Sequence, residues 1–196
     1  PTWMLTMRYP ARTRGFTLVE LILTLALVAM LAGIASTSWT RLISSTRHTD
    51  VINDTRRMFA VARSYAVHQK TLTTVCPLSP ALRCTDDWNN AVSVFPDRNN
   101  DKRPDAGKVH RVFTLTRGQS SLYSRTAGRG YFQLSAKGMS HGTMGSLVAC
   151  SASTNGRFDM SYLALNIGGR IRTLHDEDGD GEIRLPWGTT ITCPGP

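Results

Sequence analysis

Hydrophobic residues dominate the chain from Phe16 to Trp39. The 24 residues of this stretch contain a single charged side chain, Glu20, and are mostly Leu, Ile, Val, Ala and Met. As a helix that rises about 1.5 Å per residue, the stretch is long enough to span a bilayer. It therefore predicts a membrane-spanning helix.

After Trp39 the pattern changes to polar residues interrupted by apolar residues at helical spacing. This spacing gives a helix with one half-apolar face, and no proline occurs between Phe16 and Pro77. We therefore expect one helix from Phe16 to about Lys70, whose second half packs on a globular domain. His48 and His68 are expected on solvated faces of this helix. The predicted buried face consists of Leu42, Val51, Ile52, Thr55, Phe59, Ala62, Ala66 and Gln69.

From Thr71 onward, short apolar runs are separated by Gly, Pro, Asn and Asp, which is typical of β-structure. The pattern predicts an α+β fold in which one long N-terminal α-helix packs against one or more antiparallel β-sheets. The expected strands are 72–76, 91–95, 109–115, 130–134, 146–151, 160–166 and 170–174.

Four cysteines, Cys76, Cys84, Cys150 and Cys193, all lie beyond the apolar stretch. In a periplasmic or extracellular domain they could be oxidised, and four cysteines allow three pairings. We favour Cys76 with Cys84, closing a short loop, and Cys150 with Cys193, tying the chain end to a strand. A zinc site is the alternative, although no pair has the two-to-four-residue spacing of a zinc knuckle.

The formal charge of the chain is +9, and its distribution is uneven. Without the three arginines that precede Gly15, 20 of the 23 Lys and Arg residues remain against 14 acids, a charge of +6. Eleven cations and two acids lie between Lys102 and Arg172. Such a stretch attracts polyanions if it folds onto one face; a generally basic, soluble surface is the alternative.

Glu20 is unusual because a carboxylate in a membrane helix is costly without a partner. Cleavage after Gly15 would create an α-amine on Phe16, which could pair with Glu20 of a neighbouring copy. The run from Arg14 to Glu20 resembles the class III signal of type IV pilins and pseudopilins. This resemblance implies cleavage between Gly15 and Phe16 by prepilin peptidase and methylation of the new amine.

The chain then divides into a cleaved leader (1–15), a transmembrane and pilus-core half-helix (16–39) and a periplasmic or extracellular pilin domain (40–196). An ordinary secretory signal peptide cut near Ala35 or Ser36 is one alternative. A plain membrane anchor with its positive side inside is another.

The domain also resembles a family, the GspH/FimT minor pilins and pseudopilins. The similarity lies in the Cys76…Cys84 loop, Asp87-Trp88, the run Val92–Phe95 with the turn Asp97–Asp101, Ser146–Cys150 and, above all, Leu165–Arg172. The last segment matches a Gly-Arg-x-Arg signature of the FimT branch, whose members bind DNA in natural transformation. The resemblance implies other major and minor pilins, prepilin peptidase, the inner membrane and DNA as partners.

The chemistry of that signature can be examined directly. Strand alternation places Arg170 and Arg172 on one face and Ile171 on the other, toward the core. Two guanidinium groups about 7 Å apart match successive phosphates, and Gly168 and Gly169 supply a turn. A solvated strand face, with or without ion pairs to the following acidic run, is the alternative. Further DNA-binding candidates are Arg125, Arg129 and Arg157.

The acidic run that follows places Asp176, Asp178 and Asp180 as in the opening of an EF-hand loop. Because Trp187 occupies the twelfth position instead of Glu, we favour a solvated acidic turn over a calcium site. The histidines are dispersed, and no phosphate-binding loop or nucleophile elbow occurs in the sequence. We expect no metal, no cofactor and no enzymatic activity.

Three functions fit these observations. The first is a minor pilin of a type IV pilus, assembled at or near the tip and binding DNA for natural transformation. The second is a GspH-like minor pseudopilin of a type II secretion system. The third is an anchored or secreted β domain that binds carbohydrate or metal.

Overall fold

The computed structural model describes residues 15–142, 144–152 and 158–194, except for the side chains of residues 34–44. The chain divides into two units, Pro1–Trp39 and Thr40–Pro196. One α-helix, α1 (Leu18–Gln69), runs through the boundary. Its ends agree with the predicted helix to within two residues.

Local hydrogen bonds explain where α1 begins and ends. The backbone N–H of Glu20 donates to Thr17 Oγ1 (3.3 Å), as in the first half of a capping box. At the other end, Lys70 adopts a left-handed conformation (φ 48°), and Thr71 N–H donates to Ala66 O (3.1 Å). This is a Schellman motif in which lysine occupies the usual glycine position.

In the first unit, the described residues from Gly15 to Gly33 are all exposed. Phe16 is 84% exposed, and the leucines of this segment are 53% exposed or more. Among the residues that the structure describes, no helix reaches the length and hydropathy needed to cross a membrane. The expected bilayer span from Phe16 to Trp39 is therefore not confirmed.

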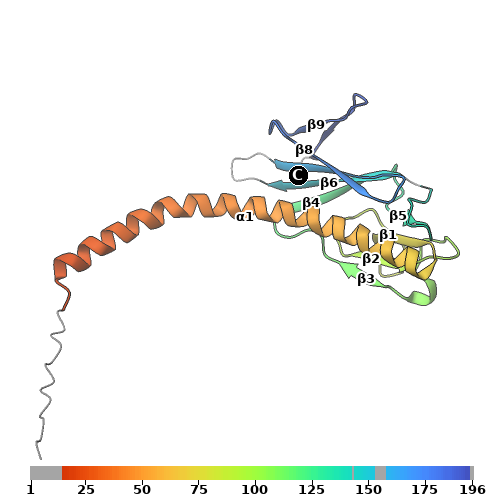
Figure 1. Ribbon diagram of the computed structural model, residues 1–196, viewed down its shortest axis with the longest axis horizontal. Helices are drawn as coiled ribbons and strands as arrows, with labels where there is room; N and C mark the ends of the chain where they lie inside the picture. Colours follow the sequence, from red (N-terminus) through yellow and green to blue (C-terminus); the bar gives the residue numbers. More distant parts are fainter. Residues whose placement is uncertain (1–14, 143, 153–157, 195–196) are drawn as a thin grey trace, which may run out of the picture. The chain divides into compact units, whose positions relative to one another are not determined.

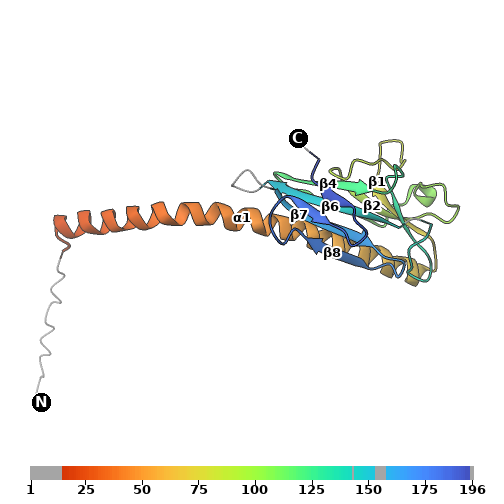
Figure 2. The same ribbon diagram turned by 90° about the horizontal axis from the view of Figure 1, so that it is seen from above.

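The second unit contains two four-stranded antiparallel sheets and a small hairpin (Figures 1 and 2). The first sheet has the order β3-β2-β1-β5, the second β4-β6-β7-β8, and β9 pairs with β10. A 3-10 helix, η1 (Asp105–Gly107), follows the first two strands. The strands are β1 (Thr73–Pro77), β2 (Val92–Pro96), β3 (Arg111–Phe113), β4 (Ser120–Arg125), β5 (Phe132–Leu134), β6 (Gly145–Ala152), β7 (Phe158–Leu165), β8 (Ile171–His175), β9 (Glu182–Arg184) and β10 (Thr190–Thr192).

The predicted α+β fold is confirmed, and each of the seven expected strands is present with shifted ends. The sequence did not predict β4, β9 or β10. The strand β4 is rich in serine and lies at a sheet edge, and the other two have three residues each. Such short or polar strands carry too few apolar positions for a period of two to be visible.

The main core lies between the second half of α1 and the inner faces of both large sheets. Phe132 connects the helix to the first sheet. Its ring packs edge-on against Phe59 of the helix and against the buried Trp88, with distances between ring centroids of 5.2 and 5.3 Å. The predicted helix face is buried as expected at Val51, Ile52, Thr55, Phe59, Ala62 and Ala66. Gln69, by contrast, is exposed, and the side chain of Leu42 lies outside the described residues.

A second core lies on the opposite face of the β4-β6-β7-β8 sheet. It contains Val148, Met160 and Tyr162 of that sheet and Ile183 and Ile191 of the β9–β10 hairpin. Figure 1 shows β9 on the side of this sheet away from α1. The sheet is therefore covered on one face by the helix and in part on the other by the hairpin.

Both favoured disulfides are confirmed. Cys76 is bonded to Cys84 and Cys150 to Cys193, with Cα–Cα distances of 5.5 and 6.0 Å. The second bond joins β6 to the segment after β10, so it fixes the hairpin onto the outer face of the sheet. Because all four sulfurs are in disulfides, the alternative of a zinc site is wrong.

The expectation that His48 lies on a solvated face of the helix is wrong. Its side chain is 8% exposed, with Nδ1 3.0 Å from Ser151 Oγ and Nε2 2.9 Å from Ser161 Oγ. Ser161 Oγ also lies 2.9 Å from Nδ1 of His175. A histidine can be buried here because both ring nitrogens find hydroxyl partners on strands that are remote in sequence. His68 is exposed, as predicted.

Candidate nucleic-acid interface

The hairpin between β7 and β8 carries the Gly-Arg-x-Arg element. Gly169 N–H donates to Asn166 O (2.9 Å), and Gly169 has a φ of 70°. A turn followed by a left-handed glycine is the geometry of a three-residue hairpin loop. The predicted turn is present, and of its two glycines Gly169 supplies the positive φ.

This turn is also packed against a neighbouring loop. A Cβ atom on Gly169 would lie 2.1 Å from the carbonyl oxygen of Gly138. Ser140 N–H donates to Ile167 O (2.9 Å), and Arg63 Nε on α1 donates to Gly138 O (3.1 Å). The turn thus contacts the backbone of the 138–140 loop, which is itself bonded to the helix through Arg63. These contacts fix the start of β8, where Arg170 and Arg172 lie.

Arg170 and Arg172 are exposed, whereas Ile171 between them is partly buried against the main core. Thr173 faces the helix, since its Oγ1 accepts a hydrogen bond from Arg56 Nη2 (2.8 Å). Residues two apart on a strand share a face. Arg172 therefore projects from the outer face of the sheet, opposite Ile171 and Thr173.

Strand register places Arg125 in line with Arg172. Arg125 of β4 pairs with Ser146, Ser146 with Ala164, and Ala164 with Arg172. Antiparallel partners point to the same face, so these four residues form one row across the outer face. With three strand spacings, the ends of the row lie about 14 Å apart. We call these four residues, together with Arg170, which lies two residues before Arg172 in the chain, the arginine row.

The acidic run after β8 has its own cation. Arg184 forms ion pairs with Asp178 (3.3 Å), Asp180 and Glu182 (3.3 Å). The hydrogen bond with Asp180 raises the pKa of Arg184 and lowers the pKa of that carboxyl. Within the described part of the chain, no carboxylate forms an ion pair with a member of the arginine row. The acidic run therefore forms no ion pair with Arg170 or Arg172 among the described residues, and a solvated strand face stays the alternative to a DNA-binding role for these two arginines.

The same contacts bear on the metal candidates. Ligand oxygens of Asp176, Asp178 and Asp180 lie within 4.8 Å of one another. However, both oxygens of Asp176 accept backbone N–H groups, from Gly179 and Gly181 (2.8 Å each). With Arg184 on the other two carboxylates, the loop is a self-contained acidic turn.

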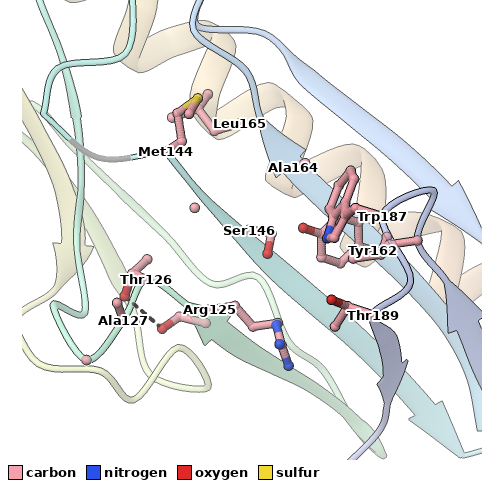
Figure 3. Close-up of a pocket in the computed structure, with 14 residues that line it drawn as sticks. Arg125, Thr126, Ala127, Met144, Ser146, Tyr162, Ala164, Leu165, Trp187 and Thr189 are labelled. Carbon is pink, nitrogen blue, oxygen red and sulfur yellow. Dashed lines mark hydrogen bonds between the residues drawn. The ribbon is translucent and has the colours of Figure 1, made fainter.

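A groove of about 760 Å³ lies beside the arginine row on the outer face (Figure 3). Its lining includes Arg125, Ser146 and Ala164 of the row, together with Tyr162 and Trp187. Trp187 lies in the loop between β9 and β10 and is 65% exposed. Sequence reasoning did not single out Trp187 as a site residue, although its place between Pro186 and Gly188 in a predicted turn is a signal for an exposed aromatic side chain.

The remaining candidates do not all join this site. Arg129 is exposed in the loop after β4, where its N–H donates to Thr126 O (3.4 Å). Arg157 lies outside the described residues. At the other end of the chain, Gly15, Phe16 and Glu20 are exposed in the first unit, which is the state expected of a segment that contacts another molecule.

One long helix, packed with its second half on antiparallel sheets and carrying an exposed apolar first half, defines a pilin-like protein. Comparisons with known families agree. The family described as type II transport protein GspH matches residues 52–164, and the prokaryotic N-terminal methylation motif matches residues 10–36. Since the first match covers more than half of the chain, the protein belongs to the GspH family of pilins and pseudopilins.

One solved structure shows the same fold. A crystal structure of the type IV minor pilin FimU of Pseudomonas aeruginosa PAO1 matches with a TM-score of 0.50 and 18% identity, covering 68% of this chain and 90% of FimU. A second crystal form of FimU gives a TM-score of 0.47 and 17% identity, covering 66% and 91%. A comparison with curated protein sequences gives no match.

Proposed function

We propose that this protein is a minor pilin of a type IV pilus that binds DNA without sequence specificity for natural transformation. The observation that carries the DNA-binding part is the arginine row. Its three arginines are exposed, Arg125 and Arg172 lie on the outer face of the sheet, and none of the three has an ion-pair partner among the described residues. Guanidinium groups bind phosphate oxygens bidentately. Such contacts release counterions and carry no base information.

Assembly uses the first unit. Prepilin peptidase cleaves between Gly15 and Phe16, and the new α-amine is methylated. Before assembly the segment 16–39 anchors the chain in the inner membrane. The chain then enters the pilus at or near the tip. There the exposed apolar residues pack against helices of other pilins, and the amine of Phe16 pairs with Glu20 of a neighbour. The match to the N-terminal methylation motif supports this sequence of steps.

Processing has a direct test. Mass spectrometry of the protein from pilus-producing cells is expected to give an N-terminal peptide that begins with N-methyl Phe16. Replacing Gly15 by a bulky residue, as in Gly15→Leu, is expected to leave the leader attached. Recovery of an unmodified N-terminus upstream of Gly15 from the wild-type protein would contradict the proposal.

The alternative function is that of a GspH-like minor pseudopilin in a type II secretion system. The description of the matching family favours it. In that case the outer face would contact secreted protein or other pseudopilins, and the arginine row would have no nucleic-acid ligand.

DNA binding across a salt series separates the two functions. The unit from Thr40 onward, which contains both cores and both disulfides, is titrated into labelled duplex DNA. Each phosphate contact contributes about 0.9 to the slope of log K against log salt, so Arg170→Ala/Arg172→Ala should reduce the slope by about 2. Arg83 and Arg98 are exposed in loops of the other sheet. The charge-matched control Arg83→Ala/Arg98→Ala should therefore change the salt slope little.

The outcomes are distinct. A reduced slope in the first double variant alone supports the DNA-binding pilin. Equal losses in both double variants would indicate nonspecific attraction to a basic surface. Absence of binding by the folded wild-type unit at low salt would favour the secretion pseudopilin.

A further inference from the structure

The groove beside the arginine row combines two kinds of chemistry. Among its described lining residues, Trp187 offers exposed aromatic surface next to the largely buried Tyr162, and Arg125 offers the one cation. No acidic residue is among these described lining residues. Figure 3 shows Trp187 and Tyr162 on one side of the groove and Arg125 on the other, with Ser146 between them. A ligand with a flat apolar part and an anionic part would match both sides.

Trp187 is held in place although it is exposed. Leu185 N–H donates to Thr189 O and Gly188 N–H to Leu185 O, both at 2.9 Å, and Gly188 has a φ of 85°. This is a second three-residue hairpin loop. The Cys150–Cys193 bond and the second core attach the hairpin to the sheet. The indole is therefore presented over the groove by a fixed backbone.

The size of the groove limits the ligand. Its volume of about 760 Å³ lies within the range of roughly 300–1,000 Å³ that holds small organic ligands. A nucleotide unit fits such a space, whereas a DNA double helix does not enter it. In a duplex, moreover, each base is already stacked on its neighbours and must be unstacked before it can contact a side chain.

We propose that the groove is a binding site for single-stranded DNA. An unpaired base stacks on Trp187, its phosphate contacts Arg125, and the strand continues across the outer face to Arg172. Stacking on an aromatic side chain tolerates any base, because every base has a π-face. This inference rests on the proposed function and adds to it a preference for unpaired strands, frayed ends or gaps.

The test compares single-stranded and duplex DNA on the same protein. The whole chain in detergent micelles is titrated into a fluorescently labelled 12-nucleotide oligo(dT) and a 12-base-pair duplex. Trp187→Ala is expected to weaken oligo(dT) binding by about 5- to 150-fold, the range for loss of one base–aromatic stack. Duplex binding should change less than about twofold, because its phosphate contacts remain.

Two further variants serve as controls. Trp187→Phe keeps an aromatic face and should retain most of the affinity for oligo(dT). Val112→Ala removes an apolar side chain of similar exposure (55%) from the other sheet and should change neither affinity. Circular dichroism of each variant verifies that it is folded.

The results separate this inference from the proposed function. Duplex binding that depends on Arg170 and Arg172, with no effect of Trp187→Ala on oligo(dT), overturns the groove proposal and leaves the DNA-binding pilin intact. Equal losses for both forms of DNA also overturn it. Absence of binding to both forms overturns both proposals, and a loss of self-association alone in Trp187→Ala would assign the groove to a second copy of the chain.

Discussion

The substitution Gly169→Ala addresses how the turn before the two arginines is built. Gly169 has a φ of 70°, a backbone conformation that costs an L-residue about 1–2 kcal/mol. In addition, the new Cβ would lie 2.1 Å from Gly138 O, so one of the two backbones must move. That movement disturbs the hydrogen bonds Ser140 N–Ile167 O and Arg63 Nε–Gly138 O, each contributing about 1 kcal/mol.

Together these effects predict that Gly169→Ala lowers the free energy of unfolding by about 3–4 kcal/mol, a large share of the ~5–15 kcal/mol typical of a folded domain. The melting temperature should fall by about 6–16 °C for a chain of this size. Urea denaturation of the oxidised unit from Thr40 onward, followed by circular dichroism, measures the loss.

The adjacent residue provides a matched control. A Cβ on Gly168 would meet only Asn166 Oδ1, at 3.4 Å, and Gly168 has no positive φ. Gly168→Ala should therefore change the free energy of unfolding by less than about 0.5 kcal/mol. If the two alanine variants unfold at the same urea concentration, the close approach of Gly169 to Gly138 does not hold this turn, and the reasoning is refuted.

Three further predictions concern stability. Burial lowers the pKa of His48, outweighing the opposing effect of Asp159; since the unfolded chain then binds a proton more readily, stability should fall as the pH drops below about 6.5, by at most about 1.4 kcal/mol per pH unit. Urea midpoints at several pH values check this, and His48→Gln should flatten the profile. The buried carboxylate of Asp97 accepts hydrogen bonds from Thr74, Gln133 and the N–H groups of two following residues, so Asp97→Ala should cost about 3 kcal/mol; a loss below 1 kcal/mol would contradict this role. Finally, removing Cys150–Cys193, with a separation of 43 residues, should cost about 4 kcal/mol, and removing Cys76–Cys84, with a separation of 8, about 2.5; the reverse order in thermal unfolding would refute the loop-length argument.

Local patterns predicted the features that depend on short-range interactions. The helix period between Val51 and Ala66 identified the buried face of α1, because residues three and four apart share a face whatever they pack against. Glycine at position 169 indicated a tight turn, because few other residues adopt a positive φ at low cost.

Strand pairing decided which residues of the candidate site lie side by side, and sequence reasoning alone could not. The sequence favoured Arg170 and Arg172 and gave Arg125 as a secondary candidate. It could not show that Arg125 and Arg172 lie in one row, because that depends on the register of three strand pairs. Register is a property of the whole sheet, since a slip of one residue moves every side chain to the other face.

The sequence by itself thus determined the long helix, the β-rich domain and the family, because periodicity, turn residues and motifs are local. Only the tertiary structure decided the partners of groups far apart in the chain. It buried His48 between Ser151 and Ser161, assigned the acidic run to Arg184, and placed Trp187 in the same groove as Arg125. Each of these depends on which strands meet, and that is set by burial of apolar surface over the whole domain rather than by any single segment.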